Sequence, residues 1–130
     1  MKSECITVAS GPKPMGPYSP ALRSGGMVFV SGQVGVDPST GQIAVGVRAQ
    51  AELSIRSIAA LLEAAGLGLG DVVKTTIFLA DIADFAQVNE VYASRFSTPY
   101  PARSTFQVAA LPGGALVEIE AIALASKASA

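Results

Sequence analysis

The sequence contains no histidine and no tryptophan, and Cys5 is its only cysteine. Histidine is the commonest general base and metal ligand, so its absence excludes Ser-His-Asp and Cys-His catalytic sites built from this chain. One cysteine also excludes a disulfide within the chain, and we expect Cys5 to be a small apolar side chain near the first strand rather than a reactive thiol. Proton transfer must therefore use Asp, Glu, Lys, Tyr or bound water.

Charged residues are also scarce, at 15% of the chain, and the net charge is −1. The nine basic residues do not cluster, which argues against a nucleic-acid partner bound through its phosphates. No apolar run approaches the roughly 18 residues that a membrane-spanning helix needs. The N-terminal residues "MKSECITVAS" lack the apolar segment of a signal peptide. We therefore expect a cytoplasmic protein with no membrane partner.

Hydrophobic residues make up half of the 130-residue chain, and the mean hydropathy is +0.46. The length, without a linker or an internal repeat, predicts a single domain over residues 1–130. A monomer of this size has a large surface relative to its volume, so this much apolar content is difficult to bury in one subunit. The composition therefore favours a homo-oligomer that buries further apolar surface between subunits.

The first third of the chain has the pattern of a loop followed by a hairpin. Residues 10–21 are rich in glycine and proline, which predicts a loop. The stretch "GMVFVSGQ" combines β-branched and aromatic residues bounded by glycine, which predicts a strand. In "VDPSTGQI", Asp37, Pro38 and Gly41 each favour a reversal of the chain, so we expect this turn to join two hairpin strands.

Two stretches have the periodicity of amphipathic helices. Apolar residues at spacings of three and four predict a helix over 47–65, with Gly66 as the residue that ends it. A second helix is predicted over roughly 84–97, with Asp84 as its N-terminal cap. The apolar stripe of the second helix is formed by Phe85, Val88 and Tyr92.

Three further stretches predict strands, at 71–81, about 104–110 and 115–125. The segment "LPGGA" supplies a turn between the last two strands, so hairpins are expected at both ends of the chain. Hairpins favour antiparallel pairing, which predicts an α+β fold with a mainly antiparallel sheet rather than a doubly wound α/β fold. The two helices are expected to cover one face of this sheet.

The last predicted strand has two different faces. One face is purely apolar and suits packing against the helices; it consists of Val117, Ile119, Ala121 and Ala123. The other face is apolar except for two acids; it consists of Leu116, Glu118, Glu120, Ile122 and Leu124. A face exposed to solvent would not carry so many apolar residues, so we expect another subunit to cover it.

Two residues are the first candidates for chemistry. Arg103 follows Pro99 and Pro101, which restrict the backbone, and a guanidinium matches a carboxylate or phosphate with two parallel hydrogen bonds. The competing interpretation is an ion pair of Arg103 with Glu118 or Glu120. Apolar neighbours oppose ionisation of Glu118, which is how a carboxyl is tuned towards neutral pH, although it could also be a solvated strand residue.

Four more residues are weaker candidates. Tyr18 in "GPYSPA" could line a pocket or be a surface aromatic, and Asn89 could be an ordinary exposed polar residue. Ser31 and Gly32 end a predicted strand, where backbone groups become free to meet a ligand, but Gly32 could equally well permit only a bulge. An arginine and a glutamate without histidine suit a small anionic substrate better than a peptide or a sugar.

Several stretches together resemble one protein family. They are "GPYSPA", "VSGQVGVDPSTG", "AAGLGLGDVVKTTIFLADIADFAQVNEVY", "PARST" and "VEIEAIA". In this combination and order, from about residue 14 to residue 124, they resemble the RidA/YjgF family of reactive-intermediate deaminases. The resemblance implies a chorismate-mutase-like subunit in a homotrimer, with the sheets facing a central barrel and ligand sites in clefts between subunits.

The resemblance also implies a reaction and its residues. Members of this family hydrolyse enamine and imine intermediates, such as 2-aminoacrylate and 2-iminobutyrate, to 2-keto acids and ammonia without a cofactor. By this similarity Arg103 binds the substrate carboxylate and Glu118 orients water near the imine carbon. The positions that match the pocket lining are Tyr18, Ser31, Gly32 and Asn89.

Thr105 departs from the family pattern, which has cysteine at this position. The family cysteine is thought to act through its backbone amide, which Thr105 retains, but the size and polarity of the pocket change. Three alternatives to the deaminase remain from the sequence. They are a binding module that senses 2-keto acids, a ribonuclease or translation inhibitor, and a purely structural trimer.

Overall fold

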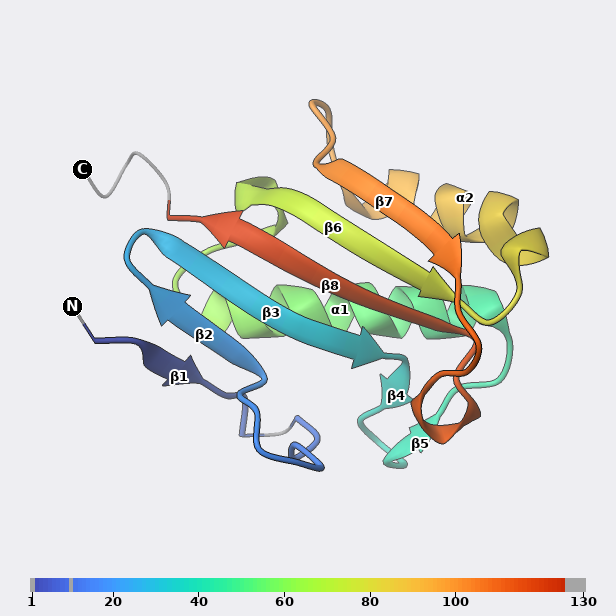
Figure 1. The fold of residues 1–130 in the computed structure, drawn as a ribbon, viewed down its shortest axis with the longest axis horizontal. Coiled ribbons are helices and arrows are strands. Elements are labelled where there is room, and N and C mark those ends of the chain that lie inside the picture. The colour runs from blue at the N-terminus through green and yellow to red at the C-terminus, as the bar shows by residue number, and fades with distance from the viewer. Residues whose placement is uncertain (1, 10, 126–130) are drawn as a thin grey trace.

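The computed structural model describes residues 2–9 and 11–125 of the chain. These residues form eight strands and two α-helices (Figure 1). The helices are α1 (Val47–Ala64) and α2 (Phe85–Arg95). The strands are β1 (Glu4–Ile6), β2 (Ala21–Ser24), β3 (Met27–Val34), β4 (Val36–Asp37), β5 (Gln42–Ile43), β6 (Val72–Leu79), β7 (Ala102–Gln107) and β8 (Val117–Leu124).

One six-stranded sheet dominates the described part of the chain, with the strand order β1-β2-β3-β8-β6-β7. Its neighbouring strands are antiparallel except for β6 and β7, which are parallel. Strands β4 and β5 form a separate hairpin across the predicted turn. Figure 1 shows α1 and α2 behind the sheet, where α1 packs on β3 and β8. The predicted α+β fold, with a mainly antiparallel sheet and two helices on one face, is confirmed.

The predicted hairpin between the last two strands is wrong. β7 pairs with β6 in parallel, and β8 lies between β3 and β6 instead of beside β7. The physical reason is the crossover: β6, α2 and β7 form a βαβ unit, whose two strands run in the same direction. β7 is consequently an edge strand, and it places Arg103 at the border of the sheet.

The loop before β2 agrees with its prediction, whereas the prediction for Cys5 fails. Residues 11–20 form no helix or strand, Ala21 begins β2, and Ser10 of the predicted loop lies outside the described residues. Cys5 is on β1 as expected, but its side chain is exposed. The apolar role expected for Cys5 is therefore wrong, because β1 is a short outer strand in which Ile6 is buried but Glu4 and Cys5 are both exposed.

The hydrophobic core lies between the helices and the rear face of the sheet. On β8, Val117, Ile119 and Ala123 are fully buried and Ala121 is 2% exposed, as the alternation predicts. They meet an apolar stripe of α1 formed by Ala51, Ile55, Ile58 and Leu62, all at most 1% exposed. Each large aliphatic side chain buried in this way contributes about 1.5–3 kcal/mol to folding.

The ends of the helices follow the sequence in one case and depart from it in the other. Gly66 follows α1 with φ of 80°, a left-handed conformation that glycine adopts readily, which confirms it as the residue that ends the helix. Asp84 precedes α2, but its side chain makes no capping hydrogen bond. The Asp81 carboxylate instead accepts a hydrogen bond of 2.9 Å from the Ala83 N–H, in the short 3₁₀ turn that leads into α2.

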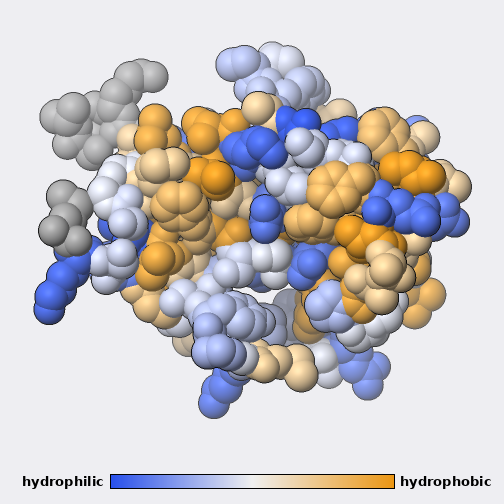
Figure 2. All heavy atoms as spheres, viewed as in Figure 1, coloured by the Kyte–Doolittle hydropathy of each residue, from blue (hydrophilic) through white to orange (hydrophobic). Residues whose placement is uncertain are grey.

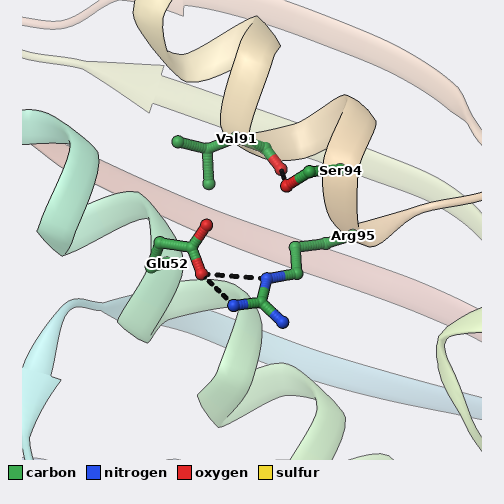
Figure 3. A network of polar contacts seen from close by, with 4 residues as sticks. All are labelled: Glu52, Val91, Ser94 and Arg95. Atoms are coloured by element: carbon green, nitrogen blue, oxygen red, sulfur yellow. Dashed lines mark hydrogen bonds and ion pairs between the residues drawn. The ribbon is translucent and has the colours of Figure 1, made fainter.

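Polar contacts hold the two helices to each other across their exposed surfaces. Arg95 of α2 donates to the Glu52 carboxylate of α1 from its Nε, at 2.9 Å, and from its Nη2 (Figure 3). This interaction raises the pKa of Arg95 above its ordinary value, first through the hydrogen bonds and then through the charge of Glu52. Arg48 of α1 donates from its Nη2 to the Glu90 carboxylate of α2. α2 is thereby fixed against α1 while its other side faces β7.

The second face of the sheet is uncovered in the single chain. We call it the open face, and it is the face towards the viewer in Figure 1. Figure 2 shows hydrophobic side chains gathered in patches over it. Its exposed apolar residues include Phe29, Phe106 and Leu124, with 38%, 45% and 49% of their surface accessible. Patches of this kind mark interaction surfaces on soluble proteins.

Candidate active site

Arg103 lies on β7 and its side chain points towards α2. Its Nη2 donates a hydrogen bond of 2.7 Å to the Asn89 side-chain oxygen. Its guanidinium carbon lies 4.9 Å from the ring centre of Tyr92 and 5.5 Å from that of Phe85. Both distances fall within the range of cation–π attraction. An amide and two aromatic rings therefore surround a cation that has been brought to the edge of the sheet.

A small cleft opens beside this guanidinium. Its volume is about 370 Å³. We call it the arginine cleft; its lining consists of Asn89, Tyr92, Ala93, Tyr100, Pro101 and Arg103. The loop that ends in Pro101 forms one wall, and α2 forms the other. Arg103 thus contributes a fixed positive charge to a cleft with mainly apolar and aromatic walls, a combination typical of small-ligand sites.

The competing ion pair of Arg103 is not found. Within residues 2–9 and 11–125, no carboxylate lies within ion-pair distance of Arg103, and Asn89 is the one side-chain acceptor it bonds. A guanidinium carries five N–H donors, so a planar anion in the cleft has donors available to it. Asn89, for which an exposed polar role was the competing interpretation, is partly buried and orients the guanidinium.

Thr105 lies two residues beyond Arg103 on the same face of β7. Its side-chain oxygen is buried and has no hydrogen-bond partner among the described residues. A buried hydroxyl without a partner is uncommon in proteins. The family cysteine, a weak hydrogen-bonding group, would leave less hydrogen-bonding capacity unused at this position.

Glu118 lies on β8 and faces the opposite side of the sheet from Arg103. It sits against Gly32: a Cβ built on Gly32 would lie 2.7 Å from the Glu118 carboxyl carbon. Gly32 belongs to an irregularity in the pairing of β3 with β8, between Val30 and Gln33, which confirms a bulge there. The absence of a side chain at Gly32 also leaves the space that the Glu118 carboxyl group occupies. Gly32 therefore both forms part of the bulge and borders a candidate site residue.

The environment of Glu118 opposes its ionisation. Burial raises the pKa of its carboxyl group above the ordinary value of 4.5, and the nearby negative charge of Glu120 raises the pKa further. This agrees with the expectation from its apolar neighbours. A carboxyl whose pKa is moved towards neutral pH is suited to exchanging protons with a substrate.

Ser31 of β3 is bonded to the loop before β2, and Tyr18 lies in that loop. The Ser31 hydroxyl donates to the Ser19 carbonyl at 2.7 Å, and the Ser31 N–H donates to the Pro20 carbonyl at 2.9 Å. These bonds hold the loop before β2 against the bulge. Tyr18 is 54% exposed, and its hydroxyl accepts a hydrogen bond of 3.5 Å from the Met15 N–H. We call Glu118, Gly32, Ser31 and Tyr18 the glutamate group.

The arginine cleft and the glutamate group are separate within one chain. Glu118 pairs with Phe78 of β6, and Phe78 pairs with Phe106 of β7, so two strand spacings of about 5 Å each separate β8 from β7. Phe106 shares the open face with Glu118, whereas Arg103, three residues earlier on β7, points to the helices. The chain alone therefore does not bring Arg103 and Glu118 together.

Three further features of the described residues bear on the search for sites. Residues 2–9 and 11–125 contain no group of three His, Cys, Asp or Glu side chains that could hold a metal ion. None of their helices has both the length and the apolar character needed to cross a bilayer.

A larger cavity, of about 980 Å³, lies between the loop before β2, α1 and the β4–β5 hairpin, and Figure 2 shows the hollow at lower centre.

Comparison with known proteins identifies the relatives of this chain. The family model described as Endoribonuclease L-PSP matches residues 8–125. The human 2-iminobutanoate/2-iminopropanoate deaminase is 46% identical over 120 residues, which cover 92% of this chain and 88% of that protein. The crystal structure of RidA from the Antarctic bacterium Psychrobacter sp. PAMC 21119 has a TM-score of 0.90 and 47% identity, covering 93% of this chain and 98% of that one. The chain belongs to the RidA family.

A second solved RidA relative carries a ligand. The crystal structure of E. coli TdcF with bound serine has a TM-score of 0.88 and 44% identity to this chain. It covers 95% of this chain and 99% of its own. The RidA resemblance found in the sequence is thus confirmed over nearly the full length. The relatives named as imine deaminases support an enzyme of that general kind.

Sequence reasoning missed two residues that contact Arg103. The periodicity predicts an apolar stripe of Phe85, Val88 and Tyr92, in which Val88 and Tyr92 are buried and Phe85 is 40% exposed. The signal that would have found them is their spacing relative to Asn89. Positions i, i+4 and i+7 share one side of a helix, so whatever meets Asn89 also meets the two rings.

Proposed function

We propose that this protein hydrolyses 2-imino acids, such as 2-iminobutanoate and 2-iminopropanoate, to 2-keto acids and ammonia. The single observation that carries the proposal is the guanidinium of Arg103, free of any carboxylate among the described residues and facing a 370 Å³ cleft. Relatives named as imine deaminases support the reaction type. The serine bound to TdcF, a small amino acid with a carboxylate, supports the class of ligand.

Substrate binding rests on Arg103. Two parallel N–H groups of the guanidinium bind the substrate carboxylate, and the Thr105 backbone N–H adds a third donor. Together they fix the adjacent C2 carbon, which is the reacting atom. Free imines already hydrolyse in water, so positioning and one proton relay supply a sufficient reduction of the barrier.

Proton transfer rests on Glu118. Its carboxyl group orients a water molecule whose oxygen attacks C2 of the protonated imine, and the carboxylate accepts the proton that this water loses. Glu118 then delivers the proton to the nitrogen of the tetrahedral intermediate. As the C2–N bond breaks and ammonia leaves, the Glu118 carboxylate takes up the proton of the C2 hydroxyl, and a C=O bond remains at C2. The raised pKa of Glu118 suits both directions of this transfer.

The complete site requires a second copy of the chain. Arg103 and Glu118 point to opposite faces of one sheet, so Arg103 of one subunit has to meet Glu118 of another. The apolar open face, with Phe29, Phe106 and Leu124 exposed, supplies a surface for this association. We propose a homotrimer with the open faces turned inward, as the family resemblance implies, and with three sites between subunits.

The decisive test is a coupled assay. An amino-acid oxidase generates the imine in the presence of semicarbazide, which traps the imine that is not hydrolysed. The wild-type protein should lower the yield of semicarbazone, and Arg103→Ala should abolish this effect while the protein remains an oligomer. Arg95→Ala is the matched control, because Arg95 pairs with Glu52 on the outer surface of the helices. Full activity in Arg103→Ala would contradict the proposal.

One observation favours a second candidate function. The arginine cleft lies within a single chain, whereas the glutamate group does not reach it. Anion binding therefore needs only the arginine cleft of one chain, whereas turnover also needs Glu118 of another. This difference suits a sensor of 2-keto acids. Both functions predict that 2-oxobutanoate binds through Arg103, which calorimetry measures, so the rate of imine hydrolysis separates them: a sensor leaves that rate unchanged.

A further inference from the structure

Tyr92 occupies the centre of a closed set of contacts around Arg103. Its ring lies under the guanidinium, 4.9 Å from the Arg103 carbon to the ring centre. Its hydroxyl is hydrogen-bonded to the Thr75 hydroxyl at 2.7 Å. Thr75 is in turn the residue of β6 that pairs with Arg103 of β7. The contacts therefore form a ring of three residues. The backbone of Arg103 pairs with Thr75, the Thr75 hydroxyl bonds that of Tyr92, and the Tyr92 ring faces the Arg103 guanidinium.

The rest of the environment keeps the Tyr92 ring in place. The ring of Phe96 stacks on that of Tyr92, with centres 4.3 Å apart and an angle of 24° between the planes. Tyr92 is 4% exposed and Thr75 is fully buried. Burial raises the pKa of the Tyr92 hydroxyl above its usual value of 10, outweighing the opposing effects of Thr75 and Arg103. The hydroxyl consequently stays protonated at neutral pH and keeps its bond to Thr75.

We propose that Tyr92 is a positioning residue that holds Arg103 in the orientation needed to bind a carboxylate. Asn89 accepts a hydrogen bond from one N–H at the edge of the guanidinium, and the Tyr92 ring packs against the face of the guanidinium. A long arginine side chain otherwise loses substantial rotamer freedom on binding a ligand. Because Tyr92 restricts that freedom before the ligand arrives, binding costs less entropy.

An ordinary core tyrosine would not have this arrangement. A core residue needs burial and a partner for its hydroxyl, and Tyr92 has both. Its ring in addition faces a cation that stands at the border of the arginine cleft. A core role predicts that changes at Tyr92 alter stability alone. A positioning role predicts that they alter the order of the Arg103 side chain and its affinity for anions.

The inference rests on the proposed function for the identity of the ligand but not for the behaviour of Arg103. The experiment therefore begins with the ligand-free protein. The Nε–H signal of Arg103 is assigned by ¹⁵N NMR through its absence in Arg103→Lys. Its relaxation is then compared in wild type, Tyr92→Phe and Tyr92→Leu. The leucine change is also made together with Thr75→Val, so that no hydroxyl is left without its partner.

The control for lost stability is Val88→Ala, which removes a buried side chain of α2 that is 1% exposed. We expect Tyr92→Leu, alone and with Thr75→Val, to lose the ordered Nε–H signal and to bind 2-oxobutanoate about tenfold more weakly. Tyr92→Phe keeps the ring and should lose no more than about threefold in affinity. Val88→Ala should lower the melting temperature without changing the Arg103 signal or the affinity.

The outcomes separate the two proposals. An unchanged Arg103 signal in both leucine variants overturns the positioning role, whatever the wild-type protein catalyses. So does equal loss of Arg103 order in Val88→Ala, because it would trace the effect to stability. Failure of the wild-type protein to accelerate imine hydrolysis overturns the proposed function alone, since the ordering of Arg103 by Tyr92 is measured without substrate.

Discussion

At the scale of single residues, the notable feature is a guanidinium, that of Arg103, that forms no ion pair with a described residue. Arg103 has an amide and two rings beside it where an ion pair would be the usual solution. Guanidinium is planar and more weakly hydrated than an ammonium group, so it tolerates such surroundings at a lower cost than lysine would. Its charge consequently remains available to a ligand instead of being neutralised by Glu118 or Glu120.

Glu118 should make the stability of the protein depend on pH. Its pKa is raised above 4.5 in the folded chain, so between these two pKa values the folded state binds more protons than the unfolded state. The free energy of unfolding therefore falls as pH rises through this window. Glu118→Gln removes the ionisation, and in the dissociated subunit, where no Arg103 faces Glu118, we expect it to stabilise the fold at pH 7 more than at pH 4. Urea unfolding at one protein concentration measures the difference.

The control for this pH effect is Glu63→Gln, which neutralises an exposed carboxyl group on α1. Its effect on unfolding should be small, as for most substitutions of exposed residues. A Glu118→Gln variant that is stabilised equally at pH 4 and pH 7 would show that burial does not penalise the charged form of Glu118.

The sequence indicates candidate residues by their type, but it does not indicate which residues they contact. Arg103 and Glu118 stand out because charge is rare in this chain. Asn89 is a weaker candidate from the sequence, since its contact with Arg103 depends on which strand α2 covers, and that is a property of the tertiary structure. The same holds for Tyr92, whose burial is predicted by periodicity but whose cation neighbour comes from β7, eleven residues away in the sequence.

At the scale of elements, local patterns predicted strands and helices but not every pairing. β3, α1 and β6 begin and end close to their predicted bounds, because hydrophobic period and glycine positions are local signals. The partner of β7 is not a local property. "LPGGA" indicates a turn, and a 3₁₀ turn is present at Pro112–Gly114, but that turn leads β8 back between β3 and β6. Arg103 lies at the sheet border because this strand order leaves β7 at the edge.

Two glycines at the end of β3 should respond differently to substitution by alanine. A Cβ at Gly32 meets only the end of the flexible Glu118 side chain, at 2.7 Å. We expect Gly32→Ala to change stability by less than about 1 kcal/mol. The displaced carboxyl group should nevertheless lower the rate of imine hydrolysis on the order of 10- to 100-fold. The semicarbazide assay and urea unfolding provide the two measurements.

Gly35→Ala is the matched comparison. A Cβ at Gly35 would lie 2.4 Å from the Cα and the carbonyl oxygen of Gln50, which are backbone atoms of α1 and cannot move away separately. Overpacking of this kind costs about 1–3 kcal/mol. The opposite pattern, with Gly32→Ala unstable but fully active, would show that the space beside Glu118 serves folding rather than the reaction.

At the scale of the whole molecule, one sheet carries the two candidate catalytic residues, Arg103 and Glu118, on opposite faces. The helices cover the rear face and hold Arg103 at its border, while Glu118 lies among apolar residues of the open face. Exposure of Phe29, Phe106 and Leu124 is unfavourable for a free monomer of this size. Association through this face would bury these side chains and, in the same step, bring Glu118 of one subunit within reach of Arg103 of the next.

Mixed oligomers test this association directly. Arg103→Ala and Glu118→Gln chains carrying different affinity tags are coexpressed, and trimers that retain both tags are purified. In a cyclic trimer each site takes Arg103 from one subunit and Glu118 from its neighbour, so any trimer with both variants contains one intact site among three. We expect each variant alone to be inactive and the mixed trimers to recover about one third of the wild-type rate. Because a site built within one chain would never be restored by mixing, inactive mixed trimers would rule out the shared site.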